Sequence, residues 1–185
     1  MSRRTQDDFE RAVEHRLGGH ALAMDLDAFQ CSWLLHEAAI ASRRRLEHEA
    51  LREFSLGWTQ FELLWHLWLF EEEEMRHVAE AIAISKGSLT ETVTGLAARG
   101  LVRRRTSDQD RRSVLISITE AGSDLVMAAI PRVNAVEGDI TAGMNIAAKR
   151  TLAEMLRGIL SASRRSARSS MAPVPSTSIL PQARG

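Results

Sequence analysis

The chain has 185 residues and a formal net charge of +0, with 44% apolar and 26% charged residues, as in ordinary soluble globular domains. Its single cysteine, Cys31, excludes an internal disulfide and a zinc site built from several cysteines. No apolar run reaches the ~18 residues that a membrane helix needs, and the first residues lack the apolar core of a secretory signal. We therefore expect a cytoplasmic protein with no membrane association, in which any nucleic-acid surface is a local patch.

The first third of the chain predicts a short arm and a long helix. Residues 1–20 are polar and predict a flexible arm or a frayed helix around Phe9 and Val13. Within residues 21–55, a helical pattern runs from about Asp25 to Phe54 with its apolar positions near one face. Thr59 and Glu62 have the spacing of a capping box, which predicts the start of a largely apolar, buried helix.

Four consecutive carboxylates, Glu71 to Glu74, come next. We expect them to open a helix, where the macrodipole favours negative charge. A metal site is the alternative, but adjacent residues point in different directions around a helix. Met75, Val78, Ala79 and Ile82 then line one face of that helix.

The stretch from Ser85 to Arg112 predicts a second helix and a hairpin. Ser85 can cap the helix, whose inner side carries Leu89, Val93 and Leu96. Gly100 ends it, a basic strand follows, SDQD is typical of a turn, and residues 114–119 alternate as in a strand.

Two further helices are expected at residues 120–163. Thr119 can cap the first, which runs to about Gly143 and is bent by Pro131; Asn145 can cap the second, which carries an apolar stripe. Residues 164–185 hold three of the four prolines and no acid, so we expect a disordered basic tail. That tail either contacts DNA phosphates or stays in solvent.

Seven basic and three acidic side chains leave a net charge of +4 between Ser85 and Arg112. A solvated basic face is the alternative interpretation. The charge, however, coincides with a helix, a turn, a helix and a hairpin in the order of a winged helix-turn-helix, here at residues 56–119. The expected fold is mainly α with a small β-hairpin wing and long N- and C-terminal dimerisation helices.

In such a module the second helix enters the major groove, and the hairpin tip reaches a minor groove that attracts guanidinium groups. Asp108 and Asp110 would orient neighbouring arginines. The predicted DNA contacts are Ser85, Lys86, Ser88, Thr90, Thr94, Arg103, Arg105, Asp110, Arg111 and Arg112.

The run from Ile82 to Gly122, with its DxDRR-type wing and the helix start Ile118-Thr119-Glu120-Ala121-Gly122, resembles the MarR family of bacterial transcriptional regulators. The resemblance implies an obligate homodimer and repression at a pseudo-palindromic operator, often relieved by a small aromatic or phenolic ligand. It also implies that Arg112 is the wing arginine and Asp110 its partner. Glu91 departs from the family pattern, so the operator sequence does not follow from it.

The resemblance places an effector between the first helices and the DNA-binding lobe. An aromatic acid paired with an arginine would suit a cleft of tryptophan and histidine side chains. The alternative is that the tryptophans are core residues. The candidate effector residues are Trp33, His36, Trp58, Trp65 and His66.

Other functions are weaker alternatives. Cys31 could sense oxidants, but no basic residue lies within several positions of it and the chain has no tyrosine, so a small core residue is the simpler interpretation. Zinc sensing through His36, His48 or His66 lacks a third donor at ligand spacing. No nucleophile with acid and base converges, and no cofactor motif is present, which argues against an enzyme. A protein-interaction module that has lost DNA binding remains a third class.

Overall fold

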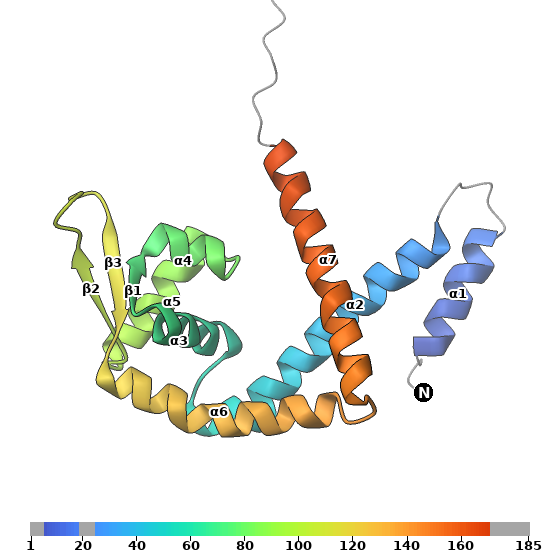
Figure 1. Cartoon of the computed structure of the whole chain (residues 1–185), viewed down its shortest axis with the longest axis horizontal. Coiled ribbons are helices and arrows are strands. Elements are labelled where there is room, and N and C mark those ends of the chain that lie inside the picture. Colours follow the sequence, from blue (N-terminus) through green and yellow to red (C-terminus); the bar gives the residue numbers. More distant parts are fainter. Residues whose placement is uncertain (1–5, 19–24, 171–185) are drawn as a thin grey trace, which may run out of the picture. The chain divides into compact units, whose positions relative to one another are not determined.

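The computed structural model describes residues 6–18 and 25–170, and the chain divides into two compact units, 1–140 and 141–185 (Figure 1). The described part of the first unit forms, in order, α1 (Gln6–Gly18), α2 (Leu26–Arg45), a π-helical segment (Leu46–Leu51), a 3-10 turn (Arg52–Phe54), α3 (Trp58–Phe70), β1 (Glu72–Glu74), α4 (Met75–Ala81), α5 (Lys86–Ala98), β2 (Val102–Thr106), β3 (Val114–Ile118) and α6 (Glu120–Ile140). The second unit contributes α7 (Ile146–Ser170). The expected mainly helical fold with a small wing is confirmed.

The strands form one antiparallel sheet in the order β1-β3-β2. β2 and β3 are the predicted hairpin, with Arg104 opposite Ile116. β1 lies on the other edge of β3, with Glu73 opposite Ile116. The expectation that the whole acidic run opens a helix was wrong, because backbone pairing with β3 holds Glu72–Glu74 extended and α4 begins at Met75.

The core of the first unit joins α3, α4, α5, the sheet and α6. The predicted inner side of α5 is confirmed, since Leu89, Val93 and Leu96 are at most 1% exposed. Val78 and Ala79 of α4 and Ile82 directly after it are also buried, as their spacing predicted. Burying each such leucine or valine contributes about 1.5–3 kcal/mol, so this core fixes α5 against the sheet.

Most of the predicted helix ends are confirmed. Ser85 Oγ accepts from the Ser88 N–H at 3.1 Å, and Thr119 Oγ1 accepts from the Gly122 N–H at 3.1 Å. Gly100 follows α5 with a φ of 72°, a left-handed conformation that favours glycine. These caps define where α5 and α6 begin and where the chain turns into the hairpin.

The capping box predicted from Thr59 and Glu62 was wrong. α3 begins two residues earlier than that box implies, with Gly57 as its N-cap. Gln60 Oε1 accepts from the Gly57 N–H at 3.0 Å, and Glu47 Oε1 accepts from the Trp58 N–H at 2.9 Å. Glu47 belongs to the preceding π-helical segment, so this is a tertiary contact that local spacing does not reveal.

The long helix expected up to Phe54 is present, but it changes geometry on the way. α2 continues into the π-helical segment and the 3-10 turn, and Ser55 ends it with a φ of 52°. None of the α2 residues is buried, and Leu26 and Leu34 remain 42% and 40% exposed. The predicted apolar face of α2 is therefore largely uncovered in the single chain.

Part of the predicted N-terminal arm is an ordered helix. In α1 the Phe9 ring stacks on Trp33 of α2, with 4.6 Å between ring centroids. Residues 1–5 and 19–24 lie outside the described residues, so the flexibility expected there is not addressed.

In the second unit, Asn145 Oδ1 accepts from the Ala148 N–H at 2.9 Å, which confirms the predicted cap of α7. The predicted stripe is exposed, with Leu152 and Ile159 at 38% and Leu160 at 57%. α7 runs to Ser170, so the disorder expected from residue 164 was wrong up to that point. The remaining tail, 171–185, lies outside the described residues. Within the described part of the chain, no helix has the length and apolarity to span a membrane.

Candidate nucleic-acid interface

α5 presents a polar surface opposite its buried side. All five residues of this helix and its N-cap that were predicted to contact DNA are exposed: Ser85, Lys86, Ser88, Thr90 and Thr94. Glu91 is exposed on the same helix. The burial of Leu89, Val93 and Leu96 on the opposite side forces these polar groups outward.

The threonine hydroxyls of α5 have restricted roles. Thr90 Oγ1 donates to the Lys86 carbonyl at 2.8 Å, and Thr94 Oγ1 donates to the Thr90 carbonyl at 2.7 Å. Because each hydroxyl has one proton, which it donates within the helix, both oxygens can act toward a ligand only as acceptors. Toward a base they can accept from an amino group or offer the methyl group to thymine.

Arg104 is a residue that the set of predicted contacts omits. It lies opposite Ile116 on the core-facing side of the hairpin, and its Nη2 donates to Thr94 Oγ1 at 3.0 Å. The guanidinium therefore lies beside the polar side of α5. The pairing of alternate strand residues could have identified it, since Arg104 has the opposite orientation to Arg103 and Arg105.

The wing tip is a loop held by its own side chains. Ser107, which is buried, accepts from the backbone N–H groups of Gln109 and Asp110, and its own N–H donates to the Ser113 carbonyl at 2.9 Å. Asp110 Oδ1 accepts from the Arg112 backbone N–H at 2.9 Å. Asp110 thus shapes the turn through the backbone, not through the guanidinium as expected.

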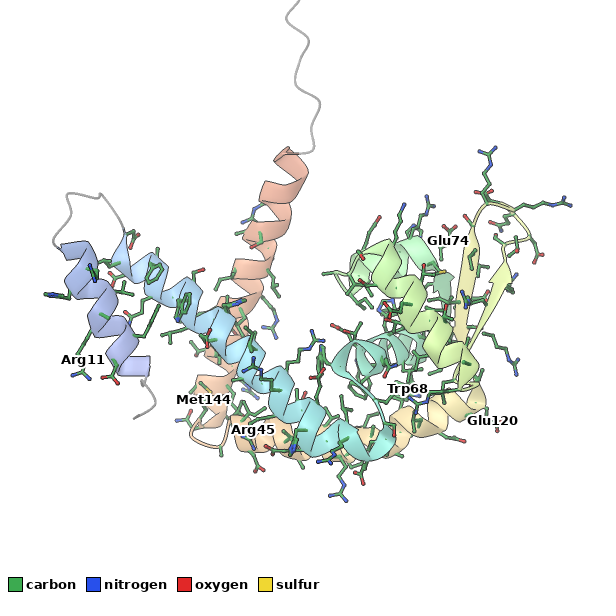
Figure 2. The ribbon with its side chains drawn as sticks, turned by 180° about the vertical axis from the view of Figure 1, so that it is seen from behind. Arg11, Arg45, Trp68, Glu74, Glu120 and Met144 are labelled. Carbon is green, nitrogen blue, oxygen red and sulfur yellow. The ribbon has the colours of Figure 1, made fainter. Side chains whose placement is uncertain are left out.

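Three arginine side chains are left available around this wing. In the described part of the chain, the guanidinium groups of Arg103, Arg111 and Arg112 form no hydrogen bond or ion pair, and all three residues are exposed. Figure 2 shows long side chains ending in nitrogen that extend from the wing tip away from the helices. They are free to meet phosphate oxygens.

Arg105 differs from these arginines. Its Nε and Nη2 donate to the two oxygens of Glu72 at 3.0 and 2.6 Å, and its Nη1 donates to Asp108 at 3.0 Å. The bonds from Arg105 hold the pKa of Glu72 below its ordinary value. Two carboxylates therefore pair with Arg105, and the orienting role predicted for Asp108 agrees with this bond. To make its predicted contact with DNA, Arg105 would have to break or share these bonds.

Arg99 is also committed within the fold, because it donates to the backbone carbonyls of Ser55 and Phe54 at 2.8 and 2.9 Å. The net charge counted along the sequence thus includes two arginines that hold structure together. The basic side chains that remain available for the predicted DNA contact are Lys86, Arg103, Arg104, Arg111 and Arg112.

A hollow of about 310 Å³ separates α5 from the wing. Its edges include Lys86 and Thr90 of α5, Arg112 and Ser113 of the wing, and Arg76 of α4. Arg76 is paired with Glu74 at 2.7 Å, and Figure 2 shows Glu74 beside the hairpin at the start of α4. The surface is concave and basic, as a groove for a DNA backbone requires.

The five predicted effector residues do not form one cluster. Trp58 and Trp65 line a cavity between α3 and α6 of about 410 Å³. Trp33 instead packs against Phe9 and Phe29, and His36 is exposed on α2. The predicted single cleft is therefore wrong for three of its members.

His66 is the third of those members. Its Nε2 lies 2.6 Å from Glu73 Oε2, and its ring lies 4.8 Å from that of Phe70. This places His66 at the side of α3 that faces β1, and it is absent from the cavity lining. Its role is to bridge α3 and β1.

The cavity contains carboxylates where an arginine was expected. Its lining consists of Trp58, Phe61, Glu62, Trp65, Ile130, Val133, Asn134 and Glu137. Partial burial raises the pKa of Glu62, an effect that Arg43, the Trp58 side chain and His66 oppose. An arginine that pairs with an acid is absent from this lining, so that expectation was wrong.

The structure gives little support to the redox site at Cys31 or to the zinc site considered from the sequence. Cys31 is exposed, which contradicts its interpretation as a core residue. Among the residues described, no three histidine, cysteine, aspartate or glutamate side chains come together as a metal site. Zinc sensing through His36, His48 or His66 therefore has no ligand set there.

Comparisons with known proteins give the same assignment as the geometry. The model of the MarR family matches residues 56–114. YdcH of Bacillus subtilis, an uncharacterised HTH-type transcriptional regulator, is 31% identical over 109 residues, which are 57% of this chain and 74% of the relative.

Solved structures share the fold. A mutant of Escherichia coli MarR complexed with operator DNA has a TM-score of 0.68 at 21% identity, covering 74% of this chain and 99% of that one. Bordetella bronchiseptica BpsR, whose DNA binding is regulated by 6-hydroxynicotinic acid, has a TM-score of 0.65 at 25% identity, covering 70% and 98%. The chain therefore belongs to the MarR family and is a winged-helix, DNA-binding transcriptional regulator.

Proposed function

We propose that this regulator is a homodimeric repressor of a pseudo-palindromic operator and that a small aromatic ligand releases it. The observation that carries the proposal is the basic concave surface between α5 and the wing, with Lys86 and Arg112 on its two edges. A surface of this shape and charge matches a duplex with α5 in the major groove and the wing tip at the minor groove.

The polar side of α5 supports sequence-specific binding. Lys86 can reach a guanine edge or a phosphate, and Thr90 and Thr94 can read amino or methyl groups. Glu91, exposed beside them, can accept from a cytosine amino group. Arg111 and Arg112 add phosphate or minor-groove contacts from the wing.

Uncovered apolar surface supports the homodimer. α2 exposes Leu26 and Leu34, and α7 exposes Met155 at 63% and Leu160 at 57%. Stripes of this kind on long helices bury themselves against a partner, and a second copy supplies an identical stripe. The two copies of α5 would then meet successive major grooves, about 34 Å apart.

The aromatic cavity supports ligand control. Trp58, Phe61 and Trp65 come from α3, which also packs against β1, β3 and α5, and Ile130 and Val133 come from α6. α6 begins directly after β3 at the Thr119 cap. A ligand that separates α3 from α6 therefore shifts the elements that carry α5 and the wing, and it favours a state with poor operator fit.

A gel-shift series with the intergenic DNA upstream of the protein's own gene tests the proposal. We expect a retarded band whose stoichiometry is one dimer per operator, with sedimentation giving a dimer in the absence of DNA. A panel of aromatic compounds should include at least one that removes the band without dissociating the dimer. No retarded band at low salt, or a monomer in solution, would contradict the proposal.

A further inference from the structure

The cavity between α3 and α6 is lined by acidic and not by basic side chains, which is unusual for a site that binds an acid. Three aromatic side chains and two carboxylates, Glu62 and Glu137, line it together with Ile130, Val133 and Asn134. All of these residues belong to the described part of the chain, and none of the lining residues is lysine, arginine or histidine. Glu62 therefore places a carboxylate beside the apolar surface of the wall.

The two basic side chains whose charge acts on Glu62, Arg43 and His66, form hydrogen bonds to other residues. Arg43 acts on Glu62 through its charge, but its guanidinium donates to Glu47 Oε1 at 3.4 Å and to Thr59 Oγ1 at 3.2 Å, outside the lining. His66 is held by Glu73 at 2.6 Å. Neither side chain is among the residues that line the cavity.

The aromatic side chains form a continuous wall beside Glu62. The rings of Trp58 and Phe61 are 6.0 Å apart and tilted by 49°, and those of Phe61 and Trp65 are 6.3 Å apart and nearly parallel at 25°. Ring faces carry negative quadrupole density that attracts a cation, and tryptophan attracts it most strongly. Glu62 is half-buried among them.

We infer that this cavity binds a small aromatic cation, such as a protonated amine or a quaternary ammonium, with its charge between the tryptophan rings and Glu62. The inference rests on the proposed function in that it takes this cavity as the effector site, and it replaces a general aromatic ligand with a cationic one. At about 410 Å³, the cavity lies within the range for small-ligand sites.

The opposite charge is disfavoured here. An aromatic acid would place its carboxylate near Glu62 with no basic residue in the cavity lining, and these two like charges out of bulk water would repel strongly. A neutral aromatic ring would gain apolar contact alone. The charge of the ligand is thus the property that this cavity selects.

Three probes of similar size separate these cases: benzyltrimethylammonium, benzyl alcohol and benzoate. Calorimetric titration of the full chain at pH 8 should show saturable binding of benzyltrimethylammonium, at least tenfold tighter than benzyl alcohol, and no binding of benzoate. Glu62→Gln, which keeps the shape of the side chain, should weaken the cation about tenfold. Glu80→Gln, a carboxylate on the exposed surface of α4, should leave it unchanged.

Equal binding of the three probes, tighter benzoate, or an unchanged affinity in a folded Glu62→Gln variant would overturn the inference. Circular dichroism establishes that the variant is folded. A second readout separates this inference from the proposed function. If benzoate alone releases operator DNA, the inferred preference for a cation is wrong but an aromatic effector is supported. If the cation binds in a manner that depends on Glu62 but does not release DNA, the proposed control of DNA binding through this cavity is wrong.

Discussion

Arg105 of β2 binds both carboxylate oxygens of Glu72 of β1, although β3 lies between the two strands. This ion pair spans the outer face of the sheet and joins the wing to the strand that follows α3. The pair also balances the charge of Arg105. Arg105 therefore stabilises the wing, whereas the unpaired arginines of the wing are available to contact DNA.

The pair gives stability a defined dependence on pH. The bonds from Arg105 lower the pKa of Glu72 below its ordinary 4.5 in the folded chain, so the stabilisation is present above that value. It is lost as the pH falls through the lowered pKa. Glu72→Gln should therefore reduce the free energy of unfolding at pH 7, and the difference from the wild type should shrink in acid. Urea unfolding at both pH values measures this, with Glu80→Gln as the control.

The effect of Glu62 on stability should change with pH in the opposite direction to that of Glu72. Partial burial raises its pKa in the folded state, so folding favours the protonated form, and stability falls as the pH rises from the ordinary to the raised pKa. Glu62→Gln removes this cost, and its melting temperature relative to the wild type should increase between pH 4 and pH 8. A difference in melting temperature that stays constant over this interval would show that the carboxyl has no shifted pKa.

Arg104 should contribute to sequence discrimination. Its bond to Thr94 places the guanidinium against the exposed polar side of α5, whereas Arg103 lies on the outer face of the sheet. Arg104→Ala should weaken operator binding by about 1–3 kcal/mol and reduce the preference for operator over unrelated DNA. Arg103→Ala should weaken both DNAs by a similar factor. Anisotropy titrations with the two DNAs would refute this role if the two variants behaved alike.

Gly122 should be irreplaceable where α6 meets the hairpin. A Cβ at this position would lie 2.2 Å from the Leu101 carbonyl oxygen and 2.8 Å from Ile118 Cγ1. The backbone cannot yield without moving the wing, so Gly122→Ala should destabilise the fold by roughly 1–3 kcal/mol or more. At Gly158, inside α7, no described atom beyond the helix's own backbone lies within 4 Å of the equivalent position. Gly158→Ala should therefore stabilise the protein by about 0.4–1 kcal/mol, and urea titration measures both variants.

Local patterns in the sequence predict the elements that carry the DNA surface. The inner spacing of Leu89, Val93 and Leu96 predicts which side of α5 is exposed, and alternation around Ile116 predicts the hairpin. Ser85, Thr119 and Asn145 cap helices by contacts within three residues, so local sequence is enough to identify them.

Contacts between distant residues account for the failures. Glu72–Glu74 have no strand pattern of their own, and pairing with β3 makes them a strand. The ion pair of Arg105 does not follow from local sequence, because its partner Glu72 lies 33 residues earlier in the chain. The proposed effector set failed for a related reason, since Trp65 and His66 are neighbours in sequence but only Trp65 reaches the cavity.

The salt dependence of DNA binding tests the central claim that the surface between α5 and the wing holds the duplex. Each phosphate contact that is lost lowers the slope of log K against log salt by about 1. Arg112→Ala should lower both affinity and slope, whereas Arg105→Ala should leave the slope unchanged, because Glu72 and Asp108 already neutralise that charge. An Arg112→Ala variant with wild-type affinity and slope would contradict the account.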